Sequence, residues 1–199
     1  IRCLTNLALT HATGGEPETG LGCVERARLL LAQKPDRFTE CELYKMESLV
    51  CFFGRRWVEG IEAARRGLEL AKEYDFPYEA AVNAHNMGEC YVRTGDYKAA
   101  FASFRYSFEL SRENGIEHLE DVNLRMLGFI DAFRFGSEEG RGHVVESIRK
   151  AEARGNVWDN VQARFLLAMI EQQRGETAEA EATLREALRV ASENGYASY

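Results

Sequence analysis

The sequence has little of several features that mark other classes of protein. It contains three prolines in 199 residues, and no apolar run approaches the roughly 18 residues that a membrane-spanning helix needs. The N-terminus also lacks the pattern of a signal peptide. We therefore expect a helical, cytoplasmic protein with no membrane partner.

Positive charge is scarce as well. The formal net charge is -7, and none of the successive forty-residue stretches of the chain has an excess of Lys and Arg over Asp and Glu. A protein that binds nucleic acid needs a concentrated basic face to displace the counterions of the phosphates. The composition therefore predicts no nucleic-acid partner.

The chain also lacks the residue patterns of common catalytic and metal sites. Its five cysteines include no CxxC pair, its four histidines never stand four residues apart on one helix, and no serine lies in a GxSxG sequence. We predict that the cysteines are buried, reduced thiols and that the chain has no cofactor, no metal site and no catalytic residue. We do not expect an enzyme.

What the chain has is a repeat of forty residues, and we call the place of a residue within its repeat its unit position. Small residues recur at unit positions 8, 20 and 27: Ala8, Ser48, Gly88, Gly128 and Ala168; Gly20, Gly60, Ala100, Gly140 and Ala180; Ala27, Gly67, Ser107, Ser147 and Ala187. Such self-similarity is the signature of a solenoid. We therefore divide the chain into the units 1–40, 41–80, 81–120, 121–160 and 161–199, which form one repeat domain.

Each unit is predicted to be a helical hairpin. In the clearest unit, apolar residues recur at helical spacing over 81–94 and again over 97–114, with the turn Gly95-Asp96 between them. Gly115 is a helix stop, because glycine readily takes a left-handed conformation after a helix. The corresponding stops are Pro35, Asp75, Gly155 and Gly195.

The small residues have a physical cause. Where two helices cross closely, a side chain larger than alanine or serine would hold their backbones apart. Larger apolar residues fill neighbouring columns, except that Glu47 replaces an apolar residue at unit position 7 and Arg28 replaces one at unit position 28. At these two places we expect register shifts or exposed edges.

The third unit resembles the tetratricopeptide repeat. The stretch 86–91, the turn Gly95-Asp96-Tyr97, and then Ala100, Phe104 and Ser107 follow the pattern of that family. The first and fifth units match as well. The second and fourth match less well, because Arg55 and Phe135 replace the turn glycine.

The resemblance implies an all-α, right-handed superhelical solenoid that binds a protein or peptide on its concave face. The forty-residue period is similar to that of the long-helix subgroup, which includes kinesin light chains, polarity adaptors and maltose-type bacterial activators. The excess of Arg over Lys is compatible with a bacterial source. Because the chain begins at Ile1 and ends one residue before the fifth unit is complete, we expect it to belong to a larger signalling or regulatory protein.

The first helix of each unit is expected to line the concave groove. Unit positions 5, 6, 9, 12 and 13 supply the candidate binding residues, which are Lys45, Leu49, Phe52, His85, Asn86, Glu89, Arg93, Arg125, Phe129, Phe133, Phe165 and Met169. This groove is apolar with a basic and polar strip, and Lys45, Arg93 and Arg125 would hold acidic groups of an amphipathic peptide. Helix packing of the aromatic residues and solvation of the charged ones are the alternative interpretations.

Two further functional hypotheses remain open at this point. In the first, the superhelix senses a small ligand through His85, Arg125, Phe129 and Phe165. In the second, the chain self-associates through a last helix that carries Leu184, Leu188 and Val190. The family's carboxylate clamp for chaperone tails is disfavoured. Only Lys45 and Asn86 match its five positions, whereas Leu49, Val122 and Met126 do not.

Overall fold

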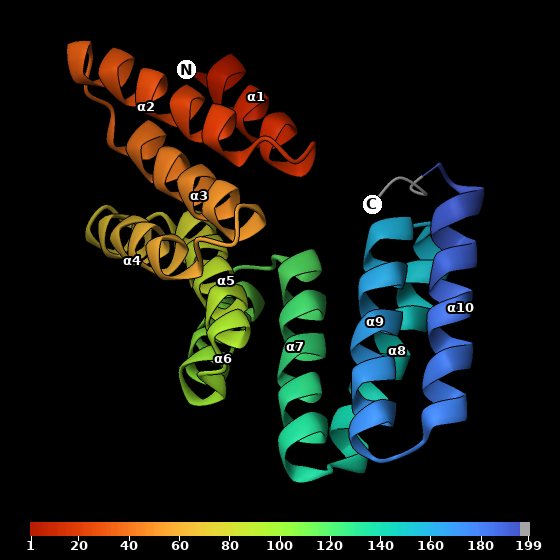
Figure 1. Cartoon of the computed structure of the whole chain (residues 1–199). Coiled ribbons are helices and arrows are strands. Elements are labelled where there is room, and N and C mark those ends of the chain that lie inside the picture. Colours follow the sequence, from red (N-terminus) through yellow and green to blue (C-terminus); the bar gives the residue numbers. More distant parts are fainter. Residues whose placement is uncertain (196–199) are drawn as a thin grey trace. The chain divides into compact units, whose positions relative to one another are not determined.

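The fold was analysed in a computed structural model, which describes residues 1–195 (Figure 1). This part of the chain forms ten α-helices and no strand. The helices are α1 (Arg2–Thr13), α2 (Pro17–Gln33), α3 (Arg37–Phe53), α4 (Trp57–Glu73), α5 (Pro77–Thr94), α6 (Tyr97–Glu113), α7 (Glu117–Phe135), α8 (Glu138–Arg154), α9 (Val157–Gln173) and α10 (Thr177–Glu193). The predicted all-α fold of helical hairpins is confirmed.

The chain divides into two compact units, 1–120 and 121–199. In the first unit, the hairpins α1–α2, α3–α4 and α5–α6 follow one another, and each later hairpin begins by packing its first helix on the preceding hairpin. In the second unit, α8 contacts α9, and α9 forms a hairpin with α10. Helices α3, α5 and α9 therefore each cover a surface of the helices before them in their own compact unit.

The helix ends agree with the turn residues of the sequence. Gly95 and Gly115 take left-handed backbone angles, with φ of 81° and 67°. Helix α5 begins at Pro77, four residues before the predicted start, because proline fits the first turn of a helix, where its missing N–H is not needed. In the second hairpin Arg55 itself is left-handed, with φ of 58°, so the residue that replaces glycine keeps the geometry of the turn.

The small residues at unit positions 8 and 20 mark helix crossings. A Cβ atom on Gly20 would lie 2.7 Å from the carbonyl oxygen of Ala8, and one on Gly140 would lie 2.5 Å from that of Gly128. These distances are shorter than normal van der Waals contact, so a side chain there would push the helices apart. The two helices of a hairpin thus meet at these two unit positions.

The two exceptions to the apolar columns pair with each other. An Arg28 nitrogen lies 2.5 Å from Glu47 Oε2, and the Arg28 guanidinium stands 5.1 Å from the centre of the Tyr44 ring. Both α2 and α3 are continuous at these positions, and both side chains are partly exposed, so of the two expected outcomes the structure shows a partly exposed edge and no register shift. An ion pair between the first two hairpins accommodates the two polar residues instead.

Four of the five cysteines are buried, as predicted, whereas the prediction is wrong for Cys3, which is exposed in the first turn of α1. Burial raises the pKa of Cys41 and of Cys51 to about 11 and the pKa of Cys90 to about 12, so these thiols stay protonated at neutral pH. Within residues 1–195, no three His, Cys, Asp or Glu side chains are grouped so that they could hold a metal ion. None of the helices described is long and apolar enough to cross a membrane.

Candidate functional site

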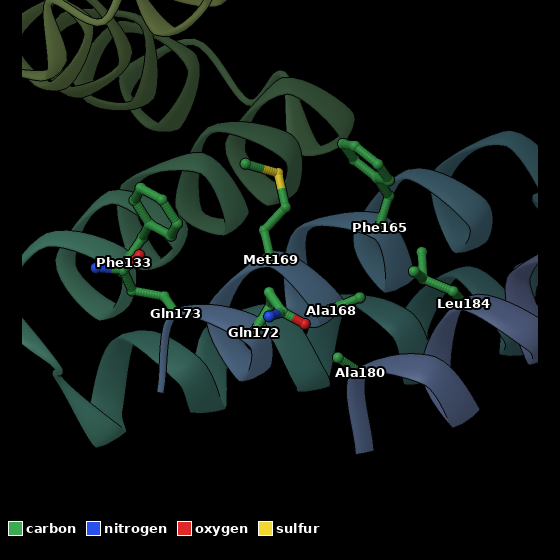
Figure 2. A pocket seen from close by; sticks show the side chains of 8 residues that line it. All are labelled: Phe133, Phe165, Ala168, Met169, Gln172, Gln173, Ala180 and Leu184. Carbon is green, nitrogen blue, oxygen red and sulfur yellow. The ribbon is translucent and has the colours of Figure 1, made fainter. Parts of the chain in front are cut away.

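The second compact unit contains a pocket of about 510 Å³. Figure 2 shows side chains from α7, α9 and α10 around it. The lining residues are Phe133, Phe165, Ala168, Met169, Gln172, Gln173, Ala180 and Leu184. No residue of this set is charged, and the side-chain amides of Gln172 and Gln173 are its polar groups. The pocket therefore suits an apolar group of a ligand.

Helix α9 supplies most of the pocket. Phe165, Met169 and Gln172 share one face of this helix because they are spaced by three or four residues. The floor contains Ala168 and Ala180, the small residues of unit positions 8 and 20 in the last hairpin. The close crossing of α9 and α10 leaves no large side chain there to fill the space.

Helix α7 supplies the wall opposite. The Phe133 ring stacks on the Phe129 ring, with ring centres 5.3 Å apart. Phe129 is fully buried, whereas Phe133 is half-buried and faces the pocket. Phe129 therefore supports the wall from the interior and presents no surface to a ligand in this structure.

Arg125 is also placed in the interior. It is 6 % exposed, and its guanidinium donates to the carboxylate and to the backbone carbonyl of Asp159, both at 3.2 Å. Asp159 lies in the first turn of α9. The charge of Arg125 thus links α7 to α9 and is not directed at a groove.

Lys45 has the same role in the first compact unit. Its Nζ atom donates to Glu79 Oε1 at 3.1 Å, and Glu79 lies in the first turn of α5 with only 2 % exposure. Asn86 is buried beside them and donates to the backbone carbonyl of Lys45 at 3.4 Å. Lys45 and Asn86 are therefore brought together, but as part of the contact between α3 and α5.

Other predicted residues of the same unit make two separate contacts that are less buried. The exposed Arg93 guanidinium stands 5.3 Å from the centre of the half-buried Phe52 ring, and His85 Nε2 lies 3.9 Å from Glu89 Oε1. Leu49 is half-buried on α3. These side chains retain some accessible surface, and within the first unit they stay candidates for ligand contact.

Three of the twelve predicted residues, Phe133, Phe165 and Met169, line the pocket together. The list of candidate residues did not include the other five pocket residues, which are Ala168, Ala180, Leu184, Gln172 and Gln173. The first two had been recognised as small crossing residues, and Leu184 as part of an uncovered last helix. The sequence analysis did not consider that small residues at a helix crossing, together with exposed side chains beside them, leave a pocket.

Fold and site together define a helical repeat protein, built from antiparallel hairpins with a period of forty residues. Two family models described as tetratricopeptide repeat match the sequence, over residues 83–114 and 161–186. These two stretches of the chain are similar to the tetratricopeptide repeat. Repeats of this kind are a scaffold type for protein interaction.

Solved structures with this fold have little sequence in common with the chain. The apo form of RapI has a TM-score of 0.74 at 16% identity and is matched over 98% of this chain and 71% of its own. A putative kinesin light chain repeat protein of Podospora anserina has a TM-score of 0.65 at 11% identity, and the match covers 98% of this chain and 95% of its own. Aspartyl phosphate phosphatase F from Bacillus subtilis has a TM-score of 0.72 at 15% identity, and the match covers 94% of this chain and 49% of its own. A search of curated protein sequences finds no significant match.

Proposed function

We propose that the chain is a protein- or peptide-binding module within a larger cytoplasmic protein of bacterial signalling or regulation. The observation that carries this proposal is the uncharged pocket of the second unit, where Phe133, Phe165 and Met169 converge. Its volume of about 510 Å³ falls within the range of about 300 to 1,000 Å³ that is typical of ligand pockets. Apolar anchors that enter such a pocket supply most of the affinity of a bound peptide.

The rim of the pocket suits a peptide backbone. Gln172 and Gln173 are exposed, and each side-chain amide can both donate and accept hydrogen bonds. The nearby Glu171 is buried and already bound: Thr183 donates to it at 2.8 Å and Arg141 at 3.5 Å. A partner would therefore meet neutral amides and apolar surface, and no unpaired carboxylate of Glu171.

The small-ligand alternative has less support. Of its four candidate residues, only Phe165 lines the pocket, and Arg125 and Phe129 are buried in the interior. A metabolite site needs several polar groups directed at one ligand. The peptide-binding proposal is therefore preferred.

The test compares two phenylalanines of the same helix. Peptides are selected from a random display library on the whole chain, and their affinity is then measured for Phe133→Glu, Met169→Glu and Phe135→Glu variants. Phe135 is 80 % exposed, ends α7 and does not line the pocket. We expect Phe133→Glu and Met169→Glu to weaken binding by about tenfold or more, because each introduces a charge into an apolar pocket.

Phe135→Glu is expected to change the affinity by less than about twofold, since surface substitutions away from a contact have small effects. Circular dichroism and thermal melting establish that each variant is folded. Equal losses in all three variants, or no loss in the two pocket variants, would refute the proposal.

A further inference from the structure

Four aromatic side chains gather in the first compact unit, where α3 begins and where α4 is followed by α5. Phe38 lies in the first turn of α3, Tyr74 caps the end of α4, Phe76 caps the start of α5, and Tyr78 lies in its first turn. The rings of Phe38 and Phe76 meet edge to face with centres 5.4 Å apart, and the Tyr74 ring stacks on Phe76 at 6.3 Å. We call these four residues the aromatic patch.

Packing within the unit accounts for one of the four rings. Phe76 is half-buried and packs on the core cluster that contains Leu68 and Ala80. In contrast, Phe38, Tyr74 and Tyr78 are 40 %, 39 % and 46 % exposed. The hairpins α1–α2 and α5–α6 lie before and after α3–α4 in the same unit, and they leave these three rings uncovered. The contacts with Phe76 hold two of the rings in place, so little side-chain freedom is lost when a ligand covers them.

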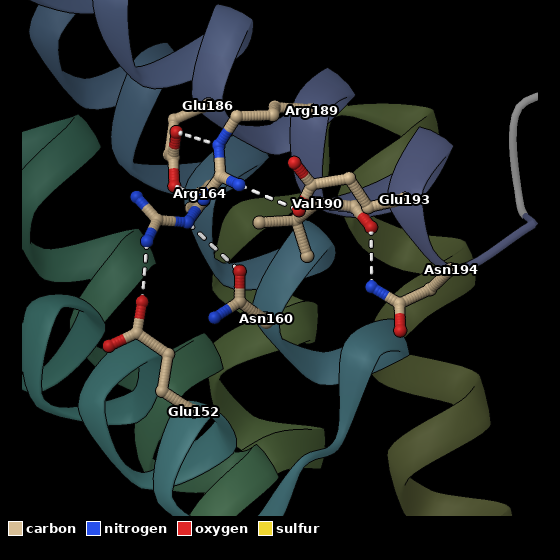
Figure 3. Close-up of polar contacts among 8 residues, drawn as sticks. All are labelled: Glu152, Asn160, Arg164, Glu186, Arg189, Val190, Glu193 and Asn194. Carbon is tan, nitrogen blue, oxygen red and sulfur yellow. Dashed lines mark hydrogen bonds and ion pairs between the residues drawn. The ribbon is translucent and has the colours of Figure 1, made fainter.

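Two acidic residues without ion pairs stand beside the patch. Many surface carboxylates of this chain pair with arginine, as Glu186 does with Arg189 at 2.6 Å in Figure 3. Glu73 and Asp75, on either side of Tyr74 in the chain, are exposed and form no ion pair among residues 1–195. Negative charge next to apolar rings favours a ligand that carries a basic residue.

The backbone of Asp75 gives a second indication that its carboxylate has a role. Asp75 has a left-handed φ of 55°, and Gly115, Gly155 and Gly195 are left-handed at the same unit position. Glycine takes this conformation without strain, whereas aspartate takes it at some cost. The chain thus keeps a carboxylate beside Tyr74 at a position where glycine would fit the turn better.

Two other classes of ligand suit the patch less well. A quaternary ammonium group needs a cage of separated rings, but the rings around Phe76 pack on one another. The chain's own cations also occupy ring faces, since Arg37 lies 5.7 Å from the centre of the Tyr74 ring and Lys45 lies 5.5 Å from that of Tyr78. A nucleic acid is disfavoured because the nearby carboxylates repel its phosphates.

The positions of the exposed rings match a polyproline II helix. Phe38 and Tyr78 occupy the same unit position on α3 and α5, which contact each other. Packed helices lie about 8 to 10 Å apart, and a polyproline II helix advances about 9 Å in each turn of three residues. Two prolines three residues apart would therefore reach Phe38 and Tyr78. The hydroxyl groups of Tyr74 and Tyr78 can donate to carbonyl groups of such a peptide.

We propose that the aromatic patch binds a polyproline II segment of a partner protein, with prolines on Phe38 and Tyr78 and a basic residue against Asp75. No two of the three prolines of the chain stand three residues apart, so residues 1–199 do not contain this ligand themselves. The site lies in the first compact unit, whereas the proposed function rests on the pocket of the second. The two sites are therefore tested separately.

The test measures binding of three labelled synthetic peptides to the whole chain by fluorescence anisotropy. The first peptide has three Pro-Pro-Ala repeats with an arginine at each end, so that one arginine lies near Asp75 in either direction of binding. The second replaces every proline by alanine, and the third replaces both arginines by glutamine. We expect the second to bind about tenfold or more weakly than the first, and the third about twofold to fivefold more weakly.

Chain variants locate the binding site. Phe38→Ala and Tyr78→Ala should each weaken binding of the arginine peptide by about tenfold, because each removes an aromatic face that a proline covers. Phe135→Ala is the control. Phe135 is 80 % exposed but lies outside the patch, so its replacement should leave the affinity unchanged. Circular dichroism and thermal melting establish that each variant is folded.

Asp75→Gly separates binding from folding. It should weaken binding of the arginine peptide by about twofold to fivefold and leave that of the glutamine peptide unchanged. The urea midpoint of unfolding should stay nearly the same, because relief of the left-handed strain offsets the greater freedom of glycine in the unfolded chain. A carboxylate with only a structural role would lower the midpoint and affect both peptides alike.

Several results would overturn the inference. The first is no binding of the arginine peptide up to millimolar concentration, and the second is a loss in Phe135→Ala equal to that in Phe38→Ala. Tighter binding of the alanine peptide would assign the patch to a helical partner instead, because alanine favours the α-helix. The proposed function fails separately, when the selected peptides bind Phe133→Glu and Met169→Glu as well as the unaltered chain.

Discussion

Single residues set how closely the helices of this protein approach one another. Glycine at unit positions 8 and 20 brings the carbonyl groups of one helix close to the Cα atoms of the next, as at Gly128 and Gly140. Other glycines of the same helices have no such role. A Cβ atom on Gly142, two residues after Gly140 in α8, would meet nothing within 4 Å.

This difference leads to a prediction with an internal control. Gly140→Ala should lower the free energy of unfolding by about 1 to 3 kcal/mol, because the added methyl group collides with the backbone of Gly128. Gly142→Ala should raise it by about 0.5 to 1 kcal/mol, since alanine is the better helix former and the site is open. Urea denaturation of both variants measures the difference. Equal effects would contradict the assignment of Gly140 to a close crossing.

At the scale of the elements, ion pairs connect neighbouring helices, and one of them lies where polar residues replace the apolar ones of other hairpins. The pair of Arg28 and Glu47 joins α2 to α3, with about a third of each side chain exposed. Replacing Arg28 leaves Glu47 half-buried without this partner, and replacing Glu47 leaves Arg28 with the longer 3.8 Å contact to Glu25 of its own helix. Either change is costly. Replacing both restores the apolar columns found at these unit positions in other hairpins.

We therefore expect non-additive energies at this contact. Arg28→Leu and Glu47→Met should each destabilise the chain by about 1 kcal/mol, whereas the double variant should be close to the unaltered chain or more stable. A double-mutant cycle from chemical denaturation measures the coupling. Single losses that simply add would show that the two side chains do not act as a pair.

A second inter-helix contact gives a pH dependence. Lys150 and Arg154 of α8 lie 2.5 Å and 2.7 Å from the two carboxylate oxygens of Asp121 in α7. Burial acts to raise the pKa of Asp121, but the hydrogen bonds from Lys150 and Arg154 outweigh it and hold the pKa below its usual value. The folded state therefore binds the proton less well than the unfolded chain.

This contribution to stability is present above the unfolded pKa of about 3.9 and is lost as the pH falls through the lower folded pKa. Asp121→Asn should be less stable than the unaltered chain by about 1 kcal/mol at pH 7. This difference in the free energy of unfolding should become smaller below about pH 4. Denaturation at pH 7 and at pH 3.5 tests this, and a gap that is equal at both values would contradict it.

At the scale of the whole molecule, repetition explains both the fold and the proposed binding surfaces. Within the first compact unit, each of the first two hairpins is partly covered by the first helix of the next hairpin, and in the second unit α9 packs on α8. The pocket depends on the same repeated packing, because Ala168 and Ala180, the small residues of the α9–α10 crossing, are among its lining residues. That the five units act as one domain stays a prediction.

The candidate site was predicted less well than the fold. Spacing placed Lys45, Arg125 and Phe129 on groove-facing positions. In the structure, Lys45 and Arg125 pair with acidic residues of a neighbouring helix, and Phe129 is fully buried against Phe133 of its own helix. Unit position 5 contributes to helix docking when the next helix supplies an acid. Periodicity shows on which face of its helix a residue lies, but it does not show whether a neighbouring helix covers that face.

The sequence by itself determined the all-α class, the turns within the hairpins and the crossings of small residues, because helical periodicity, turn glycines and side-chain volume act locally. Only the tertiary structure decided that Arg28 pairs with Glu47, that Phe129 and Arg125 are interior, and that Phe133, Phe165 and Met169 surround a pocket. Those outcomes depend on which helix covers which, and this is a property of packing between residues far apart in the chain.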